Sequence, residues 1–211
     1  MARSESYNST FPLSMPRRAP RTNQLRIIGG RWRGRRIVFA SVPGVRPTPD
    51  RVRETLFNWL GQDLAGANTL DLFAGSGALT FEALSRGAVL GVAVDHHAAI
   101  VRNLAATGAA LGASALNNAA LETHCADARS FLAQEKRSFD VIFLDPPFGT
   151  ANWDALLPAV TDRLAPSGMV YVESPEPIDA PPGLQVWRGD KAGQVHYHLL
   201  RRAVQDAARP V

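Results

Sequence analysis

Short apolar runs alternate with segments of helical periodicity through most of the chain. The runs that resemble buried strands cover residues 69–73, 89–94, 121–125 and 139–144, and helical patterns over 79–86, 98–111 and 128–134 separate them. Strands and helices that alternate in this way form a parallel sheet with crossover helices packed on its faces. The chain is therefore predicted to fold as an α/β protein.

Beyond Asp145 the pattern continues with a helix near residues 153–164 and then three strands. These strands are predicted over 169–173, 184–188 and 194–200. Because no helical segment separates the last two, they are predicted to form a hairpin. The mostly parallel sheet should therefore contain an antiparallel strand, which ordinary dinucleotide-binding folds lack.

A hairpin and a helix are predicted ahead of the sheet. Two runs with apolar residues, 25–28 and 35–39, flank a basic, glycine-flanked stretch at 29–34, which predicts a β-hairpin with a basic tip. Farther along, Thr48 or Asp50 can cap a helix that should pack on the main domain. Its apolar positions share one face and are Val52, Leu56, Trp59 and Leu60.

Charge is distributed unevenly along the chain. Residues 1–53 hold 12 of the 23 basic residues, all arginines, and only two acids, whereas the rest of the chain is slightly acidic. Arginine suits phosphate recognition and base stacking, so a nucleic-acid partner is predicted for the front of the chain. Residues 1–24 lack periodicity and are rich in Ser, Pro and Arg, which predicts a disordered basic tail.

These patterns predict a tail over 1–24, an RNA-facing hairpin and helix over 25–62, a main domain over 63–203 and a second tail over 204–211. The sequence contains no run of eighteen or more apolar residues that could span a bilayer. The single cysteine, Cys125, cannot form an internal disulfide, and a cytoplasmic protein without membrane contact is predicted. The five histidines have no accompanying ligand set, so no metal site is predicted.

Residues 71–79 have the features of a ligand-binding turn between a strand and a helix. Gly75 and Gly77 allow a sharp turn, and Asp95, at the end of the next strand, can hold the ribose hydroxyls of an adenosine. Asp71 would repel a pyrophosphate but attract the sulfonium and ammonium groups of S-adenosyl-L-methionine. The predicted cofactor-binding residues are Asp71, Phe73, Gly75, Ser76, Gly77, Asp95, His96, Asp127 and Ala128, and Asp127 is also a candidate helix N-cap.

The predicted strand 139–144 runs directly into Asp145, Pro146, Pro147 and Phe148, which are the predicted catalytic residues. Two prolines fix an extended corner and remove two N–H donors, so the Asp145 carboxylate and the Pro146 carbonyl are presented as acceptors. Two fixed acceptors can hold an NH₂ group and turn its lone pair toward a methyl donor. Phe148 offers a ring on which a flipped base can stack. The tetrapeptide therefore predicts methylation of an exocyclic amino group of a nucleobase.

Several motifs together resemble the RsmD family, the 16S rRNA guanine-N2 methyltransferases of bacteria. The resemblance is carried by residues 26–35, 46–48, 50–58, 71–79, 145–148 and 192–195, within a similarity that runs from Leu25 to about Arg202. It implies a Rossmann-like class I methyltransferase fold, with a seven-stranded, mostly parallel sheet and an antiparallel last strand. It also implies a guanine of 16S rRNA as substrate, presented in a 30S subunit or an assembly intermediate.

The resemblance further implies that the basic hairpin, with Arg51 or Arg53, lies close to the substrate entrance. The predicted RNA-binding residues are Arg31, Trp32, Arg33, Arg35, Arg51 and Arg53. For the hairpin, the alternative is a solvated edge with Trp32 packed on the domain.

Two other functions stay open at this point. A DNA adenine-N6 methyltransferase uses the same tetrapeptide chemistry, although the chain lacks an obvious segment for reading duplex DNA. A non-catalytic RNA-binding module on a degenerate methyltransferase fold is the second alternative. The presence of Asp71, Asp95 and Asp145 argues against it.

Overall fold

The computed structural model describes residues 23–39, 42 and 47–203 of the 211-residue chain. Seven strands form one sheet in the order β5-β4-β3-β6-β7-β9-β8. Their bounds are β3 (Asn68–Asp71), β4 (Leu90–Asp95), β5 (Ala120–Cys125), β6 (Phe139–Leu144), β7 (Leu164–Ser174), β8 (Leu184–Ala192) and β9 (Val195–Arg202). The first five strands in this order pair in parallel, and β9 is antiparallel to both of its neighbours. The predicted fold class, with its antiparallel last strand, is confirmed.

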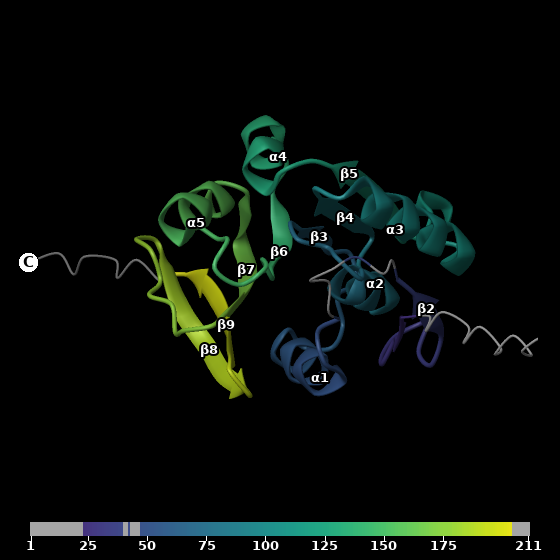
Figure 1. The fold of residues 1–211 in the computed structure, drawn as a ribbon, viewed down its shortest axis with the longest axis horizontal. Coiled ribbons are helices and arrows are strands. Elements are labelled where there is room, and N and C mark those ends of the chain that lie inside the picture. Colours follow the sequence, from purple (N-terminus) through teal and green to yellow (C-terminus); the bar gives the residue numbers. More distant parts are fainter. Residues whose placement is uncertain (1–22, 40–41, 43–46, 204–211) are drawn as a thin grey trace, which may run out of the picture.

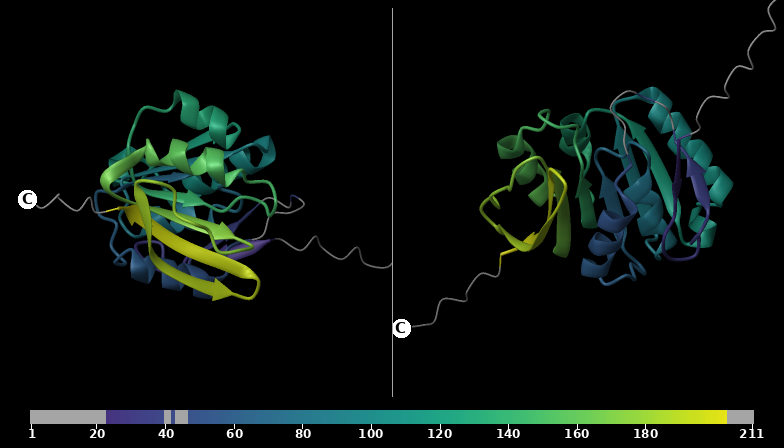
Figure 2. Two further views of the ribbon diagram at one scale, coloured as in Figure 1. Left: turned by 90° about the vertical axis from the view of Figure 1, so that its left-hand side faces the viewer. Right: turned by 60° about the horizontal axis from the view of Figure 1, so that its bottom comes forward.

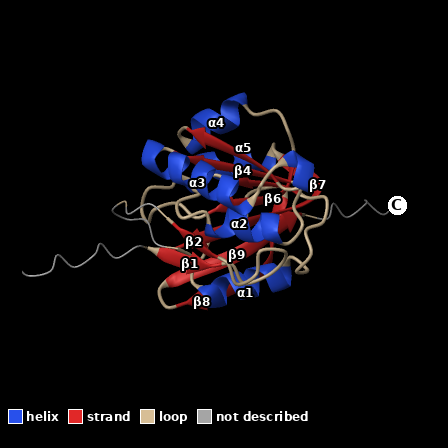
Figure 3. Ribbon diagram, turned by 90° about the vertical axis from the view of Figure 1, so that its right-hand side faces the viewer, coloured by secondary structure: helices blue, strands red, loops and turns tan. Residues whose placement is uncertain are grey.

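Helices cover both faces of the sheet (Figure 1). They are α1 (Asp50–Trp59), α2 (Ala78–Ser85), α3 (Ala98–Leu111), α4 (Ala128–Gln134) and α5 (Trp153–Thr161), with a short 3-10 turn at Ala115–Asn117. Side chains alternate along each strand, so Phe143 and Tyr171 pack toward α1 and α2, while Ile142 packs toward α4 and α5. Figure 3 shows the same layers from the side of α3, with α4 at the top and α1 at the bottom.

The predicted N-terminal hairpin is present as a separate two-stranded sheet of β1 (Gln24–Arg26) and β2 (Arg36–Val38). It lies beside α2 and α3, whereas the β8–β9 hairpin lies at the other end of the molecule (Figure 2). Leu25, Ile27 and Trp32 belong to the same apolar cluster as α1, α2 and α3, so the hairpin shares the core of the domain. The predicted tails fall outside the described residues, apart from Asn23 and Gln24.

The predicted cap of α1 is wrong. The helix begins after Pro49, whose φ of −57° already suits a helix, and no side chain caps its first turn. Asp50 instead bonds to Arg53 one turn along, and Thr48 is buried. Both residues therefore have partners within the fold that the local sequence did not reveal.

Candidate active site

Three carboxylates lie side by side at the carboxyl edge of the sheet. Asp71 ends β3, Asp145 follows β6, and Glu173 is the second-last residue of β7. The register pairs Asp71 with Phe143, and Leu144 with Val172, so the next residues along these two strands, Asp145 and Glu173, are neighbours. The two-residue period of a strand places all three on the face covered by α1 and α2. We call Asp71, Asp145 and Glu173 the carboxylate row.

Burial makes ionisation of the row harder than it is in water. It raises the pKa of Asp71 to about 7, opposed by a hydrogen bond of 2.8 Å from the Thr80 hydroxyl to the Asp71 Oδ2. Burial also raises the pKa of Asp145 well above its ordinary value, and the negative charges of Glu173 and Asp71 add to the effect. The pKa of Glu173 is raised by burial as well. Among the described residues, no lysine or arginine forms an ion pair with any member of the row.

The tetrapeptide after β6 forms the corner expected from its two prolines. Pro146 is buried, whereas the Phe148 side chain is 59% exposed. The Pro147 carbonyl accepts hydrogen bonds from the Thr150 amide (3.1 Å) and hydroxyl (2.6 Å), which close the turn. Within the described part of the chain nothing donates to the Pro146 carbonyl, so this acceptor is available beside Asp145.

The loops after β3, β4 and β5 enclose a small cleft next to the carboxylate row. Its lining includes five of the predicted cofactor-binding residues, namely Phe73, Asp95, His96, Asp127 and Ala128. Each oxygen of Asp95 accepts one backbone N–H, from Gly75 (3.1 Å) and from His97 (2.8 Å). A carboxylate oxygen can accept a second donor, so Asp95 retains capacity for two hydroxyl groups. Asp127 also caps α4 by accepting from the amides of Arg129 and Ser130.

The turn between β3 and α2 brings the other predicted cofactor residues to the same place. Gly75 and Gly77 adopt positive φ angles of 48° and 78°. A side chain on Gly77 would also collide with Phe81 and Leu104, so glycine is needed here for packing as well as for the turn. Ser76 is buried between them. These residues fit S-adenosyl-L-methionine. The adenosine of the cofactor can meet Asp95, while its cationic end meets the Asp71 carboxylate, which has no ion-pair partner among the described residues.

Two predicted RNA-binding residues are buried, and their prediction is wrong. The Trp32 side chain is packed in the apolar cluster, and its backbone N–H donates to the Ser85 Oγ. Arg53 is fully buried and forms ion pairs with Glu82 and Asp50. Trp32 is packed among apolar side chains and the Arg53 guanidinium is occupied by its ion pairs, so both stabilise the fold.

The predicted position of the hairpin tip is also wrong. Gly30 and Arg31 contact Ser85 at the carboxyl end of α2, and the Arg31 guanidinium donates to the carbonyls of Asn117 and Asn118, ahead of β5. Both places lie at the amino edge of the sheet. A strand of six residues spans about 20 Å, so the tip is about that far from the carboxylate row.

The remaining predicted RNA-binding arginines are exposed. Arg33 projects from the hairpin tip, Arg51 lies in the first turn of α1, and Arg35 donates to the Ala110 carbonyl at 3.1 Å. The pKa of Asp190 is lowered by hydrogen bonds from the Lys191 amide and the Tyr197 hydroxyl, and the positive charge of Arg51 adds to the effect. Arg51 therefore lies near the β8–β9 hairpin at the carboxyl edge. The basic side chains therefore occupy two separate regions of the surface.

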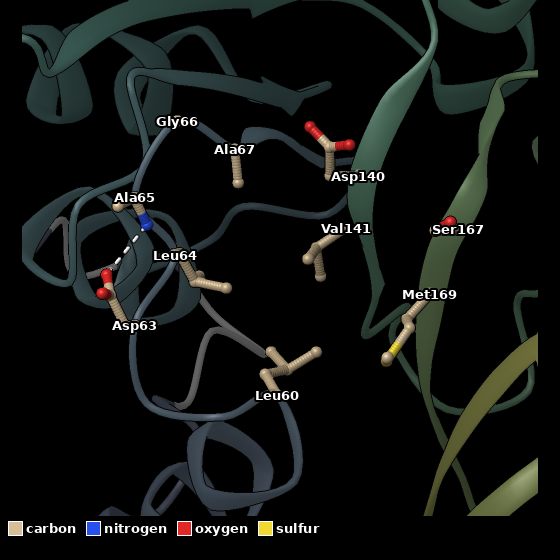
Figure 4. Close-up of a pocket in the computed structure, with 10 residues that line it drawn as sticks. All are labelled: Leu60, Asp63, Leu64, Ala65, Gly66, Ala67, Asp140, Val141, Ser167 and Met169. Carbon is tan, nitrogen blue, oxygen red and sulfur yellow. Dashed lines mark hydrogen bonds between the residues drawn. The ribbon is translucent and has the colours of Figure 1, made fainter.

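A larger cleft of about 350 Å³ lies away from the carboxylate row, at the amino edge of the sheet (Figure 4). Leu60, Leu64, Val141 and Met169 surround it. Its two acids are engaged locally, since Asp63 accepts from the Ala65 amide and Asp140 from the Asn68 amide. Its lining includes none of the predicted site residues.

Among the residues that the structure describes, no group of three His, Cys, Asp or Glu side chains could hold a metal ion. No helix in the same part of the chain is long and apolar enough to cross a membrane.

Fold, cleft and carboxylate row together define a class I S-adenosylmethionine-dependent methyltransferase. Within this class, a family model described as "Conserved hypothetical protein 95" matches residues 25–201, and the chain belongs to that family, which confirms the resemblance to RsmD proteins. The Escherichia coli protein named "Ribosomal RNA small subunit methyltransferase D" is 41% identical over 189 residues, covering 87% of this chain and 93% of the relative.

Solved structures agree with this assignment. The Escherichia coli protein yhhF, a methyltransferase by name, superposes with a TM-score of 0.76 at 41% identity, covering 87% of this chain and all of that one. RsmC of Thermus thermophilus, a 16S rRNA N2 methyltransferase in complex with AdoMet and guanosine, gives a TM-score of 0.62 at 23% identity. That match covers 87% of this chain and 50% of RsmC, and it shows a shared fold.

Sequence reasoning missed three residues beside the tetrapeptide. Glu173 is buried, accepts a hydrogen bond of 2.8 Å from the Tyr171 hydroxyl, and shares the Thr48 side chain with Asp145 as a hydrogen-bond partner. One signal was available, because Glu173 ends the predicted strand that follows the tetrapeptide. Thr48 stood within a motif that carries the family resemblance, but its contact with these two carboxylates follows from the fold and not from the local sequence.

Proposed function

We propose that this enzyme transfers a methyl group from S-adenosyl-L-methionine to the N2 amino group of a guanine in small-subunit rRNA, within a 30S subunit or an assembly intermediate. The observation that carries the proposal is the pair of acceptors at Asp145 and Pro146 beside a strongly exposed Phe148. The rRNA substrate is supported by the relatives named for that activity, and no observation favours DNA.

The residues of the corner act on the amino group. The Asp145 carboxylate and the Pro146 carbonyl accept its two protons, which directs the nitrogen lone pair away from the base ring. The cofactor supplies a methyl group bonded to a positively charged sulfur. As the nitrogen–carbon bond forms and the carbon–sulfur bond breaks, Asp145 stabilises the growing positive charge on nitrogen. The raised pKa of Asp145 makes its carboxylate a better acceptor for the proton that must then leave.

Phe148 holds the target base at the corner. An exposed aromatic ring on a closed turn can stack on a base that has left its helix, which contributes roughly 1–3 kcal/mol and offsets part of the unstacking cost. The cofactor-binding part of the proposal comprises the loop residues 71–77 with Asp95, His96, Asp127 and Ala128. Asp95 holds the ribose hydroxyls, and Asp71 faces the ammonium group.

The function is tested with labelled S-adenosyl-L-methionine and three substrates: 30S particles from cells that lack the protein, naked 16S rRNA, and DNA. We expect N2-methylguanosine in the rRNA after nucleoside digestion and mass spectrometry, with particles the better substrate. Label in DNA adenine alone would refute the proposal. Phe148→Ala should lower the rate on particles and leave the cofactor affinity, measured by calorimetry, unchanged.

We also propose that Arg31, Arg33 and Arg35 bind rRNA at the amino edge, while Arg51 binds it near the carboxylate row. An RNA that contacts both regions must extend over about 20 Å of the surface. Replacing the three hairpin arginines with glutamine should weaken particle binding and reduce its salt dependence, with Arg129→Gln on the exposed part of α4 as the matched control. Loss of cofactor binding in the triple variant would instead indicate a structural role.

A further inference from the structure

Glu173 occupies the position next to the proposed catalytic corner, on the neighbouring strand. It follows Val172, which pairs with Leu144, just as Asp145 follows Leu144. Both side chains point to the face covered by α1, and both contact the Thr48 side chain. Two carboxylates are therefore presented together to whatever lies at this edge.

The contacts of Glu173 leave it able to accept further hydrogen bonds. Its Oε1 accepts from the Tyr171 hydroxyl, and the single proton of the Thr48 hydroxyl can serve only one of the two carboxylates at a time. An ionised carboxylate has about four acceptor positions. A buried carboxylate with spare acceptor positions and no cation is costly for stability, which indicates that a donor on a ligand completes it.

The proposed substrate has a donor at the required place. Guanine carries an N1–H group directly beside its N2 amino group, and the two donors point in nearly the same direction. Adenine has an unprotonated ring nitrogen, an acceptor, beside its amino group. A second carboxylate next to the one that holds the amino group would therefore attract guanine and repel adenine.

We propose that Glu173 accepts the N1–H of the target guanine while Asp145 and Pro146 hold its N2 amino group. This inference rests on the proposed function and explains a choice that the tetrapeptide alone cannot make. Asp145 and Pro146 recognise an amino group on any base. Glu173 selects the base by the protonation of the neighbouring ring nitrogen.

The test replaces both sides of this hydrogen bond. Glu173→Gln keeps the shape of the side chain but offers an N–H donor as well as an acceptor. Particles are reconstituted with 16S rRNA that carries, at the guanine modified by the unaltered enzyme, either guanine or 2,6-diaminopurine. The analogue keeps the 2-amino group but has an unprotonated N1.

We expect the unaltered enzyme to prefer guanine over the analogue by about 10- to 100-fold in kcat/KM, the size of a charge-assisted hydrogen bond lost in a buried site. Glu173→Gln should lose a similar factor on guanine and bring the ratio of the two substrates close to one, because the amide can donate to the unprotonated N1. If Glu173→Gln left the ratio of kcat/KM for the two substrates unchanged, the inference would be overturned.

Folding and function are controlled separately. Calorimetry with S-adenosyl-L-methionine reports whether Glu173→Gln retains its cofactor site, and Glu173→Asp provides a second variant that keeps the acceptor but shortens its reach. Glu173→Asp should lose activity on guanine and retain the preference for it; a preference abolished by this variant too would contradict the inference. If the unaltered enzyme fails to methylate particles at all, the proposed function fails, independently of Glu173.

Discussion

Glu82 and the carboxylate row lie in opposite electrostatic environments. Glu82, in the middle of α2, is fully buried, and each of its oxygens accepts two hydrogen bonds. Arg53 and Arg86 supply two of the donors, and the amides of Ile28 and Gly29 supply the other two. The carboxylate row, on the same face of the sheet, receives only neutral donors and keeps raised pKa values.

The contrast distinguishes a carboxylate that stabilises the fold from carboxylates that serve a ligand. A buried carboxylate that is saturated by cations and amides links elements, and Glu82 ties the N-terminal hairpin and α1 to α2. A buried carboxylate without a cation is retained at a cost to stability, and such groups cluster where a ligand brings the missing charge or donor. In this enzyme the cofactor ammonium and the base amino group are the proposed counterparts.

The largest expected effect comes from removing the proposed catalytic acceptor. Asp145→Ala should lower kcat on particles by about 10²- to 10³-fold, the loss typical when one preorganised hydrogen-bonding group is deleted from an active site. Asp145→Asn retains an acceptor oxygen and should lose less. Single-turnover kinetics measures both rates. An Asp145→Ala enzyme as active as the unaltered one would show that Asp145 is not the catalytic acceptor.

Removing the charge of Glu82 should affect stability and not catalysis. Glu82→Gln leaves the buried Arg53 without a full counter-charge and should cost about 3–5 kcal/mol of unfolding free energy. Glu173→Gln is the matched change in the row and should cost under about 1 kcal/mol, because no cation is orphaned. Urea unfolding compares them; equal losses would show that the two regions do not differ as described.

The pH dependence of Asp71 sharpens the same comparison. Asp71 must be ionised to attract an ammonium group, and its pKa is about 7. Cofactor affinity should therefore fall as the pH is lowered from 7.5 to 5.5, approaching tenfold per pH unit, and calorimetry in Asp71→Asn should show weak binding with a flat profile. An unchanged affinity across this range in the unaltered enzyme would exclude the role.

The effect of pH on the folding stability has the opposite sign to its effect on the cofactor affinity. Because the folded-state pKa of Asp71 lies above its ordinary value of 3.8, the folded protein retains a proton that the unfolded chain loses between pH 4 and 7. In the absence of cofactor, this residue should make the protein less stable as the pH rises through that window. Asp71→Asn should remove this contribution.

The smallest effect is expected at an exposed cluster. Arg137 pairs with Glu122 and Glu135 at 3.0 and 2.7 Å, but its side chain is 42% exposed. Arg137→Gln should cost less than about 1 kcal/mol, because water solvates the separated charges, and methylation should not change. A larger loss in thermal or urea unfolding would show that burial is not what distinguishes Glu82.

Most elements could be predicted because their local patterns agree with their final environment. The α3 and α4 helices and β6 have the bounds expected from periodicity alone. The arginine-rich front could not be divided correctly, since the sequence shows the charge of Arg53 but not the distant Glu82 that buries it. For Trp32 the structure supports the alternative, packing on the domain, because its neighbours come from another part of the chain.

The part of the candidate site that could be predicted from sequence is the corner at residues 145–148, which a rigid motif fixes. The prolines at 146 and 147 restrict the corner whatever surrounds it, so Asp145 and Phe148 could be chosen from sequence. Glu173 belongs to an ordinary strand end and acquires its position only through pairing between β6 and β7. The sequence places Glu173 at the end of the strand after the tetrapeptide, but its contact with the corner depends on a register that the sequence does not state.

The position of β9 sets the order in which this enzyme can mature. β9 follows β8 in the chain, yet it lies between β7 and β8, and it places Tyr197 opposite Glu173. While the chain is being synthesised, β7 has no partner on that side until Arg202 has left the ribosome. A nascent chain therefore carries an open sheet edge beside Glu173, and the enzyme becomes competent only after β9 has closed it.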